Sequence, residues 1–392
     1  MKYLIVGCVG LLAAIAPAAA STLAPGLYEA SGKALYVGIE RELPDPAQND
    51  FFEPASGRTG ELASAGRLRL RCGLREDRRL IAARQGRLGA SLYYHGEERR
   101  PTIVLIHGAD AETREMGFIV PYFVCNGINV ASYDQRGTGE SVGNWFFSGP
   151  IQKVEDAAAV YDTFAGDRHV ESRDMGVWGF SNGGWTAPLL TLRRSIAFMI
   201  LKSAPTESVL SNIDYEVVME LRRHDASDSD IARALAMWHS VEAAIFGRAS
   251  WGEAGRMLSE DAKRPWFEYS LMPKLSVPPP PATVLGLRRA FSYDPSSTLT
   301  SVTTPTLALY GANDRKLDSA DSFTHMKQYL ERAGAHDVTV IMFPRAGHTL
   351  EVSSKGYAAD PPQRFAPGYP RIMLTWLRKS GFIQDKSQET NR

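Results

Sequence analysis

The sequence has few cysteines, no excess of either charge and no long uncharged apolar run beyond its first residues. It holds 3 cysteines in 392 residues, none in a Cys-x-x-Cys pair, so we expect neither a disulfide scaffold nor a structural zinc site. Lys and Arg total 44 and Asp and Glu total 44, which argues against nucleic acid as a partner because phosphate binding needs clustered positive charge. No His-x-x-Glu-His pattern or His/Asp cluster is present, so no metal site is expected either.

The first 20 residues have the features of a secretion signal. Lys2 is followed by an uncharged apolar run over 3–15 and by three small residues, Ala18 to Ala20. This pattern predicts cleavage near Ala20 and Ser21, and export to the periplasm or outside the cell. After cleavage no stable membrane insertion is expected, because no later segment has 18 uncharged apolar residues. A retained anchor is the alternative interpretation.

After cleavage of the signal, Cys72 and Cys125 would be the cysteines of the mature chain. In an oxidising compartment they could form one disulfide. The sequence does not tell whether their Cα atoms lie within bridging distance, so the pairing stays open. It gives no indication of the oligomeric state.

The pattern of the mature chain changes near residue 100. Before it, short strands separated by Gly, Pro and Asn turns predict a β-rich extension over 21–100. After it, apolar runs alternate with amphipathic helical patterns, which predicts an α/β fold with a mostly parallel sheet and helices on both faces. We assign this core to 101–205 and 301–385. The expected strands of the core are 103–106, 128–133, 175–178, 197–201, 306–310 and 338–342.

Between these two parts of the core, residues 206–300 show no clear strand. A helical pattern begins at a capping sequence formed by Ser227 and Asp230. We expect a helical cap insertion lying over the edge of the sheet. Its aromatic residues, such as Trp251 and Trp266, either pack in the cap or line a pocket.

The sequence Gly179-Phe-Ser181-Asn-Gly183 directly follows a predicted strand and precedes a predicted helix. Gly179 and Gly183 leave no Cβ where strand and helix approach each other around a sharp turn. Such a turn exposes the serine hydroxyl at the carboxyl end of the strand, where α/β sheets bind ligands. We therefore expect Ser181 to be a nucleophile.

A serine nucleophile needs a base, and the base needs an orienting carboxylate. Asp314 follows the strand expected at 306–310, and His348 follows the strand expected at 338–342. The order of nucleophile, acid and base along the chain fits this fold. Asp318 is the alternative acid.

An oxyanion formed at the substrate carbonyl must meet preplaced donors. The strand expected at 103–106 runs into His107, Gly108 and Ala109. We expect the backbone N–H groups of Ala109 and Asn182 to be these donors, while His107 holds its loop by hydrogen bonds.

Five segments of the sequence resemble the motif series of the α/β-hydrolase superfamily. They are residues 107–108, 133–139, 179–184, 311–314 and 346–348. The sequence is most similar to the branch that contains esterases, dienelactone hydrolase-like enzymes and serine aminopeptidase-like hydrolases. The resemblance implies a Ser–His–Asp mechanism without a cofactor, and a tight turn at 134–139 in which Arg136 is structural.

The leading hypothesis is a carboxylic ester hydrolase that forms an acyl-enzyme on Ser181 and acts on a small-molecule ester. The aromatic residues of 206–300 favour a largely apolar pocket for short or medium acyl or aromatic esters. A peptidase or aminopeptidase of the same fold is the alternative, with Glu216 or Glu220 available to bind an amine. A catalytically silent binding module is disfavoured because Ser181, Asp314 and His348 are all kept.

Overall fold

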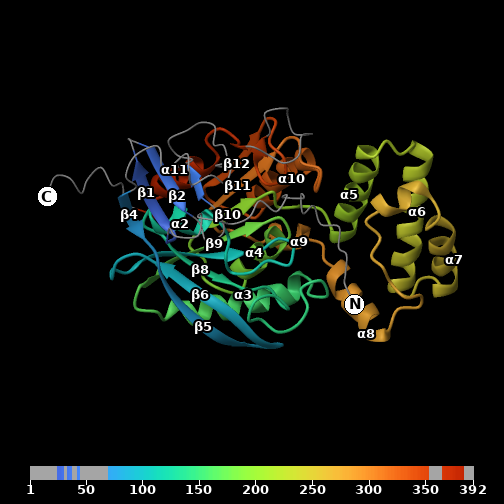
Figure 1. Ribbon diagram of the computed structural model, residues 1–392, viewed down its shortest axis with the longest axis horizontal. Helices are drawn as coiled ribbons and strands as arrows, with labels where there is room; N and C mark the ends of the chain where they lie inside the picture. The colour runs from blue at the N-terminus through green and yellow to red at the C-terminus, as the bar shows by residue number, and fades with distance from the viewer. Residues whose placement is uncertain (1–23, 31–32, 38–41, 45–68, 353–363, 384–392) are drawn as a thin grey trace.

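An eight-stranded, mostly parallel sheet forms the centre of the protein in the computed structural model (Figure 1). The structure describes residues 24–30, 33–37, 42–44, 69–352 and 364–383, so the expected signal at 1–20 lies outside the described residues. The strand order is β12-β11-β10-β9-β7-β8-β6-β5. The strands are β5 Arg75–Ala83, β6 Gly86–Tyr94, β7 Arg100–Ile106, β8 Asn129–Tyr133, β9 Val170–Phe180, β10 Met199–Lys202, β11 Thr306–Gly311 and β12 Val338–Phe343.

Both faces of this sheet are buried, as the uninterrupted apolar runs predicted. In β7, Val104 and Ile106 pack into the core on one face, while Ile103 and Leu105 pack into the core on the other, because successive side chains of a strand point to opposite faces. The first face is covered by α3 Pro150–Ala165, α4 Gly183–Thr191 and α10 Ser319–Arg332, and the second by α2 Ile119–Val124 and α11 Tyr369–Lys379. The α/β-hydrolase fold expected from the sequence is confirmed.

The boundary drawn at residue 100 differs from the pairing of the strands. β5 and β6 precede it, yet they pair antiparallel with each other, and β6 pairs antiparallel with β8 at the edge of the main sheet. A separate four-stranded sheet, β3-β2-β1-β4, lies before them in the sequence. Its strands are β1 Gly26–Ala30, β2 Lys33–Val37, β3 Glu42–Pro44 and β4 Arg69–Gly73, and a short pair joins β13 Glu351–Val352 to β14 Arg364–Phe365.

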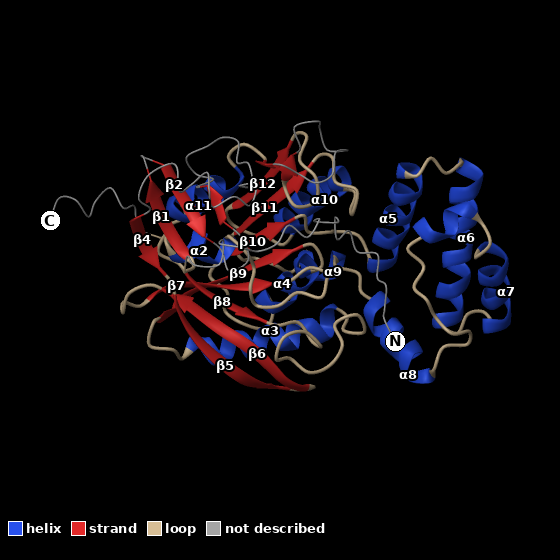
Figure 2. Ribbon diagram, viewed as in Figure 1, coloured by secondary structure: helices blue, strands red, loops and turns tan. Residues whose placement is uncertain are grey.

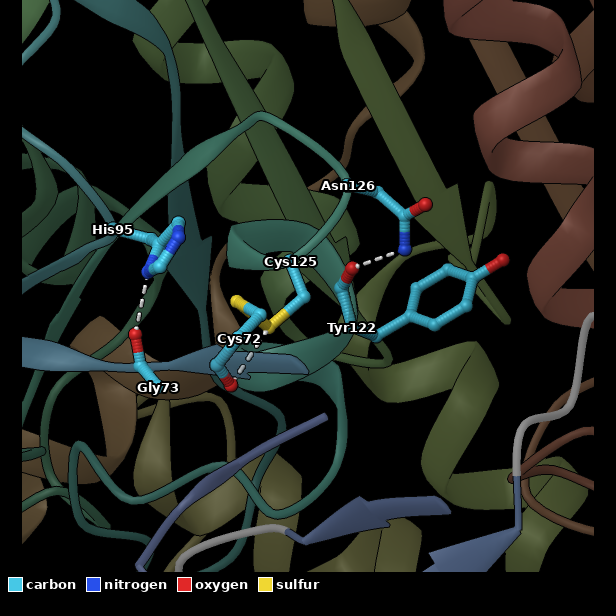
Figure 3. Close-up of a disulfide and its surroundings, with 6 residues drawn as sticks. All are labelled: Cys72, Gly73, His95, Tyr122, Cys125 and Asn126. Carbon is cyan, nitrogen blue, oxygen red and sulfur yellow. Dashed lines mark hydrogen bonds between the residues drawn. A yellow bond between two sulfur atoms is a disulfide. The ribbon is translucent and has the colours of Figure 1, made fainter. Parts of the chain in front are cut away.

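A disulfide joins Cys72 of β4 to Cys125, the residue after α2 (Figure 3). Their Cα atoms are 5.8 Å apart, which is within the range for a disulfide. Beside it, His95 Nδ1 donates to the carbonyl of Gly73 at 2.8 Å. The small sheet is thus attached to the central domain by a covalent bond and by a hydrogen bond, and the pairing that the sequence left open is formed.

The segment between β10 and β11 consists of helices and loops (Figure 2). Its helices are α5 Val209–Arg223, α6 Asp228–Ile245, α7 Trp251–Asp261, the 3-10 helix η2 Pro265–Tyr269, α8 Pro281–Phe291 and α9 Ser296–Leu299. Ser227 caps α6 by accepting from the N–H of Asp230 at 3.2 Å, as predicted. Trp266 and Trp251 pack in apolar clusters within this helical cap. The cap therefore has cores of its own, and it stands to one side of the sheet in Figure 1.

Candidate active site

Ser181 occupies the sharp turn between β9 and α4. Its φ of 51° lies in the left-handed region, which non-glycine residues rarely adopt and which is typical of strained functional turns. The glycines on either side of Ser181 are needed because a side chain at these positions would clash with the backbone. A Cβ on Gly179 would lie 2.6 Å from the carbonyl oxygen of Gly183, and a Cβ on Gly183 would lie 2.4 Å from the carbonyl oxygen of Ile106. The close approach expected from the sequence is therefore present.

Asp314 and His348 meet at the ends of neighbouring strands β11 and β12. His348 Nδ1 lies 2.7 Å from Asp314 Oδ2, and the Asp314 side chain is fully buried. The expected alternative, Asp318, instead caps α10 by accepting from the N–H groups of Ala320 and Asp321. The structure thus pairs the imidazole with Asp314. This carboxylate can hold the ring orientation and stabilise an imidazolium.

The loop that carries His348 lies beside the serine turn. The Ser203 hydroxyl donates to the carbonyl of His348 at 2.7 Å, and the ring of Phe180, next to Ser181, is 5.1 Å from the imidazole. Ser181 N–H donates to the carbonyl of Lys202 at 2.9 Å. Among the described residues, no hydrogen bond joins Ser181 to His348. Such bonds are often long without substrate and tighten when it binds.

Two backbone donors lie close to Ser181. A Cβ on Gly108 would be 3.5 Å from Ser181 Cβ, so the loop after β7 contacts the serine turn. Ala109 in this loop and Asn182 at the start of α4 both line the same cavity. In the described part of the chain, the N–H groups of Ala109 and Asn182 donate to no protein acceptor. Both are available to a ligand.

A cavity of about 240 Å³ lies between the core and the cap. Ala109 and Asn182 line it, whereas Ser181, Asp314 and His348 are not among its lining residues. Its apolar walls are Ala109, Trp145, Phe146, Pro150, Trp185, Val209, Ile213, Ala290 and Phe291. Polar and charged groups, Asp110, Ser148, Lys153, Asn182, Asn212 and Glu216, also line it. Of its aromatic lining residues, Phe291 belongs to the cap segment 206–300 from which an apolar wall was expected, while Trp145, Phe146 and Trp185 belong to the core. Glu216 was named as a possible amine-binding group, whereas Asp110 and Lys153 were not expected there. Glu216 lines the cavity, whereas Glu220 pairs with Arg223 and His224.

The charged groups of the cavity have shifted pKa values. Burial raises the pKa of Glu216, and Lys316, whose Nζ lies 3.2 Å from the carboxylate, opposes this shift. Burial lowers the pKa of Lys153 to about 8, although Glu112, Asp156 and Asp110 favour its charged form. Burial also raises the pKa of Asp110, and the nearby Glu112 adds to this shift.

His107 and Arg136 hold the loops around the site. His107 is buried; its Nε2 donates to the carbonyl of Tyr133, and its Nδ1 faces Glu112 at 3.3 Å. Arg136 is buried and paired with Asp156 through two hydrogen bonds. The contacts of His107 and Arg136 agree with the structural roles expected for them.

No group of three or more His, Cys, Asp or Glu in the described residues is arranged to hold a metal ion. A search of the described helices finds none that is both long and apolar enough to cross a membrane.

Comparison with known proteins agrees with this fold. The model of the serine aminopeptidase family S33 matches residues 97–353, so the chain belongs to this family of α/β-hydrolases. No curated protein sequence matches the chain.

Solved structures with this fold share little sequence with the chain. DcsB, solved in complex with its substrate analogue, is 13% identical with a TM-score of 0.50, over 78% of this chain and 99% of DcsB. An esterase from Pyrococcus furiosus is 14% identical with a TM-score of 0.49, over 83% of this chain and 96% of the esterase. The α/β-hydrolase GrgF from Penicillium is 14% identical with a TM-score of 0.49, over 78% of this chain and 99% of GrgF. At these identities the likeness concerns the fold alone.

Proposed function

We propose that the protein is a serine hydrolase that cleaves small carboxylic esters through an acyl-enzyme on Ser181. The observation that carries the proposal is the hydrogen bond between His348 and the buried Asp314, formed beside a serine held in the left-handed turn. An imidazole that is paired with a carboxylate and lies next to a serine is the arrangement that activates the serine hydroxyl.

The reaction follows from this arrangement. His348 Nε2 takes the Ser181 proton while Oγ bonds to the ester carbonyl carbon, and the negative charge on the carbonyl oxygen is met by the N–H groups of Ala109 and Asn182. The intermediate collapses, the C–O bond to the alcohol breaks, and His348 returns the proton to the leaving alcohol. Water then attacks the acyl-enzyme with the same base and releases the acid.

An aminopeptidase is the second candidate, and Glu216 favours it. Its carboxylate lies in the cavity, where it could receive a substrate amine. However, Lys316 Nζ already lies 3.2 Å from this carboxylate, so its charge is matched within the protein. A site built to bind an amine needs an unmatched carboxylate, which is why we favour the esterase.

One set of assays tests the proposal. Wild-type protein should hydrolyse 4-nitrophenyl acetate and react with a fluorophosphonate, and Ser181→Ala should lose both activities while its thermal unfolding midpoint stays nearly unchanged. Retained turnover in Ser181→Ala would exclude this nucleophile. Faster cleavage of an aminoacyl 4-nitroanilide, abolished by Glu216→Gln but kept by Glu220→Gln, would favour the aminopeptidase.

We also propose that the mature protein is exported. The charged start, apolar run and small residues of 1–20 support this proposal, as does the Cys72–Cys125 disulfide, since disulfides persist in oxidising compartments. Amino-terminal sequencing of the periplasmic and culture fractions should find a chain that begins near Ser21. An intact amino terminus in the cytoplasm would contradict export.

A further inference from the structure

The Gly108–Ala109 peptide carries one of the two proposed oxyanion donors. Its carbonyl belongs to Gly108 and its N–H to Ala109. Because a trans peptide is planar, these two groups point in opposite directions. Any group that holds the Gly108 carbonyl therefore also fixes the direction of the Ala109 N–H.

Gln135 holds this carbonyl from the side of β8. Its amide Nε2 donates to the carbonyl of Gly108 at 3.3 Å and to the carbonyl of Asp110 at 2.6 Å. One side-chain amide thus binds the carbonyls on both sides of Ala109. Gln135 is only 5% exposed, and the adjacent Arg136 is anchored to Asp156, so the amide has a fixed place from which to hold the loop.

Lys153 of α3 is the second donor to the same carbonyl. Its Nζ lies 3.5 Å from the oxygen of Gly108, and it forms no ion pair within 4.0 Å in the part of the chain that the structure describes. Glu112 and Asp156 act on it from farther away, but His107 binds the first and Arg136 binds the second. An ammonium at a carbonyl oxygen polarises the peptide, which strengthens its N–H as a donor.

We propose that Gln135 and Lys153 are positioning residues of the oxyanion hole, which hold the Gly108 carbonyl so that the Ala109 N–H faces the reacting carbonyl. The inference rests on the proposed function. Without the two donors the peptide can rotate and present an oxygen, which repels the oxyanion, in place of the N–H. The N–H of Asn182 would then act alone.

Kinetics of three variants test this role. Gln135→Leu should lower kcat for 4-nitrophenyl acetate by about 100-fold, the effect of losing one oxyanion donor, with KM unchanged. Lys153→Met should lower kcat less and Lys153→Arg should restore it, since arginine also donates. The exposed Lys263 of the cap gives the matched control Lys263→Met, with unchanged kcat. An unchanged kcat in Gln135→Leu, or a fall matched by a rise in KM, would overturn the proposal.

The pH profile gives a readout that a purely structural role would not move. Because the pKa of Lys153 is about 8, wild-type kcat should decline as the pH rises through 8, where the ammonium loses its charge. Glu112, Asp156 and Asp110 face this ammonium and favour its charged form. Lys153→Met should lack the decline, and a decline of equal size in Lys153→Met would contradict its role.

A crystal structure of the Gln135→Leu/Lys153→Met double variant separates this inference from the proposed function. We expect the Gly108–Ala109 peptide to rotate, so that its carbonyl leaves the position at which Gln135 and Lys153 hold it. An unchanged peptide would overturn the inference, whatever the catalytic activity of the wild type. Wild-type protein without ester turnover would refute the proposed esterase, while the direction of this peptide would still decide whether Gln135 and Lys153 hold it.

Discussion

Asp314 is held by its own loop as well as by His348. Its Oδ1 accepts from the N–H groups of Lys316 at 2.7 Å and Leu317 at 3.3 Å, while its Oδ2 faces His348. One carboxylate oxygen therefore fixes the side chain, and the other is reserved for the imidazole. This division allows the charge to be removed without changing the local fold.

Asp314→Asn should lower kcat by about 10,000-fold, because an amide stabilises neither the productive tautomer nor the imidazolium. The thermal unfolding midpoint should change little, since the amide oxygen can still accept from the loop. Ester hydrolysis and thermal unfolding should be measured together. Asp318→Asn is the matched control, because asparagine is an equally good helix cap. Comparable activity losses in both variants would contradict the assignment of Asp314.

Lys153 should make the stability of the protein pH-dependent. Its pKa falls from 10.5 to about 8 in the folded state, so between these values the unfolded chain binds more protons and the free energy of unfolding rises with pH. Lys153→Met lacks this rise. The free energy of unfolding of the wild type should therefore increase relative to that of Lys153→Met between pH 8 and pH 10.5, by at most about 1.4 kcal/mol per pH unit. Urea unfolding across this range measures the difference.

The exposed Lys263 again gives the control for that measurement. Lys263→Met removes a lysine that is exposed on the cap, so it shows what the loss of a surface lysine does to the free energy of unfolding over the same pH range. A constant difference between Lys153→Met and the wild type would show that Lys153 keeps an ordinary pKa in the folded protein.

Gly183 lies against the carbonyl of Ile106, at the point where α4 begins behind the end of β7. A methyl group there would lie 2.4 Å from that backbone oxygen and 2.8 Å from that of His107. Gly183→Ala should therefore destabilise the protein by about 1–3 kcal/mol and lower kcat, because the displaced backbone leads directly into the oxyanion loop. Gly252→Ala, whose nearest atom would be 3.7 Å away, should fold and react like the wild type. Urea unfolding and ester hydrolysis measure both.

The sequence predicted the elements whose residues are buried on both faces. The runs at 128–133 and 306–310 became β8 and β11 with nearly the same bounds. The predicted start of β9 was late, because residues 171–174 of this strand, such as Arg173, are polar and not fully buried. β5 was missed for a similar reason: it is a largely exposed edge strand rich in charged residues, so no apolar pattern marks it.

The sequence predicted those residues of the candidate site that directly follow a strand. Ser181, Asp314 and His348 each follow a recognisable strand, and the structure pairs the latter two. Gln135 and Lys153 were missed as members of the site. Gln135 was seen only as part of the turn at 134–139, and Lys153 belongs to a helix whose apolar face was the visible signal. The proposed role of Lys153 depends on its contact with Gly108, which lies 45 positions earlier in the sequence. A local sequence pattern cannot predict a contact between residues so far apart.

The disulfide should stabilise the protein without affecting catalysis. The bonded cysteines are separated by 53 positions, and a cross-link closing a loop of that length stabilises a fold by about 4 kcal/mol through the entropy of the unfolded chain. Cys125 precedes β8, so the bond lies toward the amino ends of the parallel strands, opposite the edge that carries Ser181. The Cys72→Ser/Cys125→Ser variant should unfold at lower urea concentration and keep the wild-type kcat.

Reductant provides the control for the disulfide measurement. Dithiothreitol should lower the unfolding midpoint of the wild type to that of the double variant and leave the double variant unchanged. If oxidised wild type and the double variant unfold at the same urea concentration, the bond between β4 and the end of α2 does not stabilise the fold. The small sheet would then be attached to the central domain mainly by noncovalent contacts, such as the hydrogen bond from His95 to Gly73.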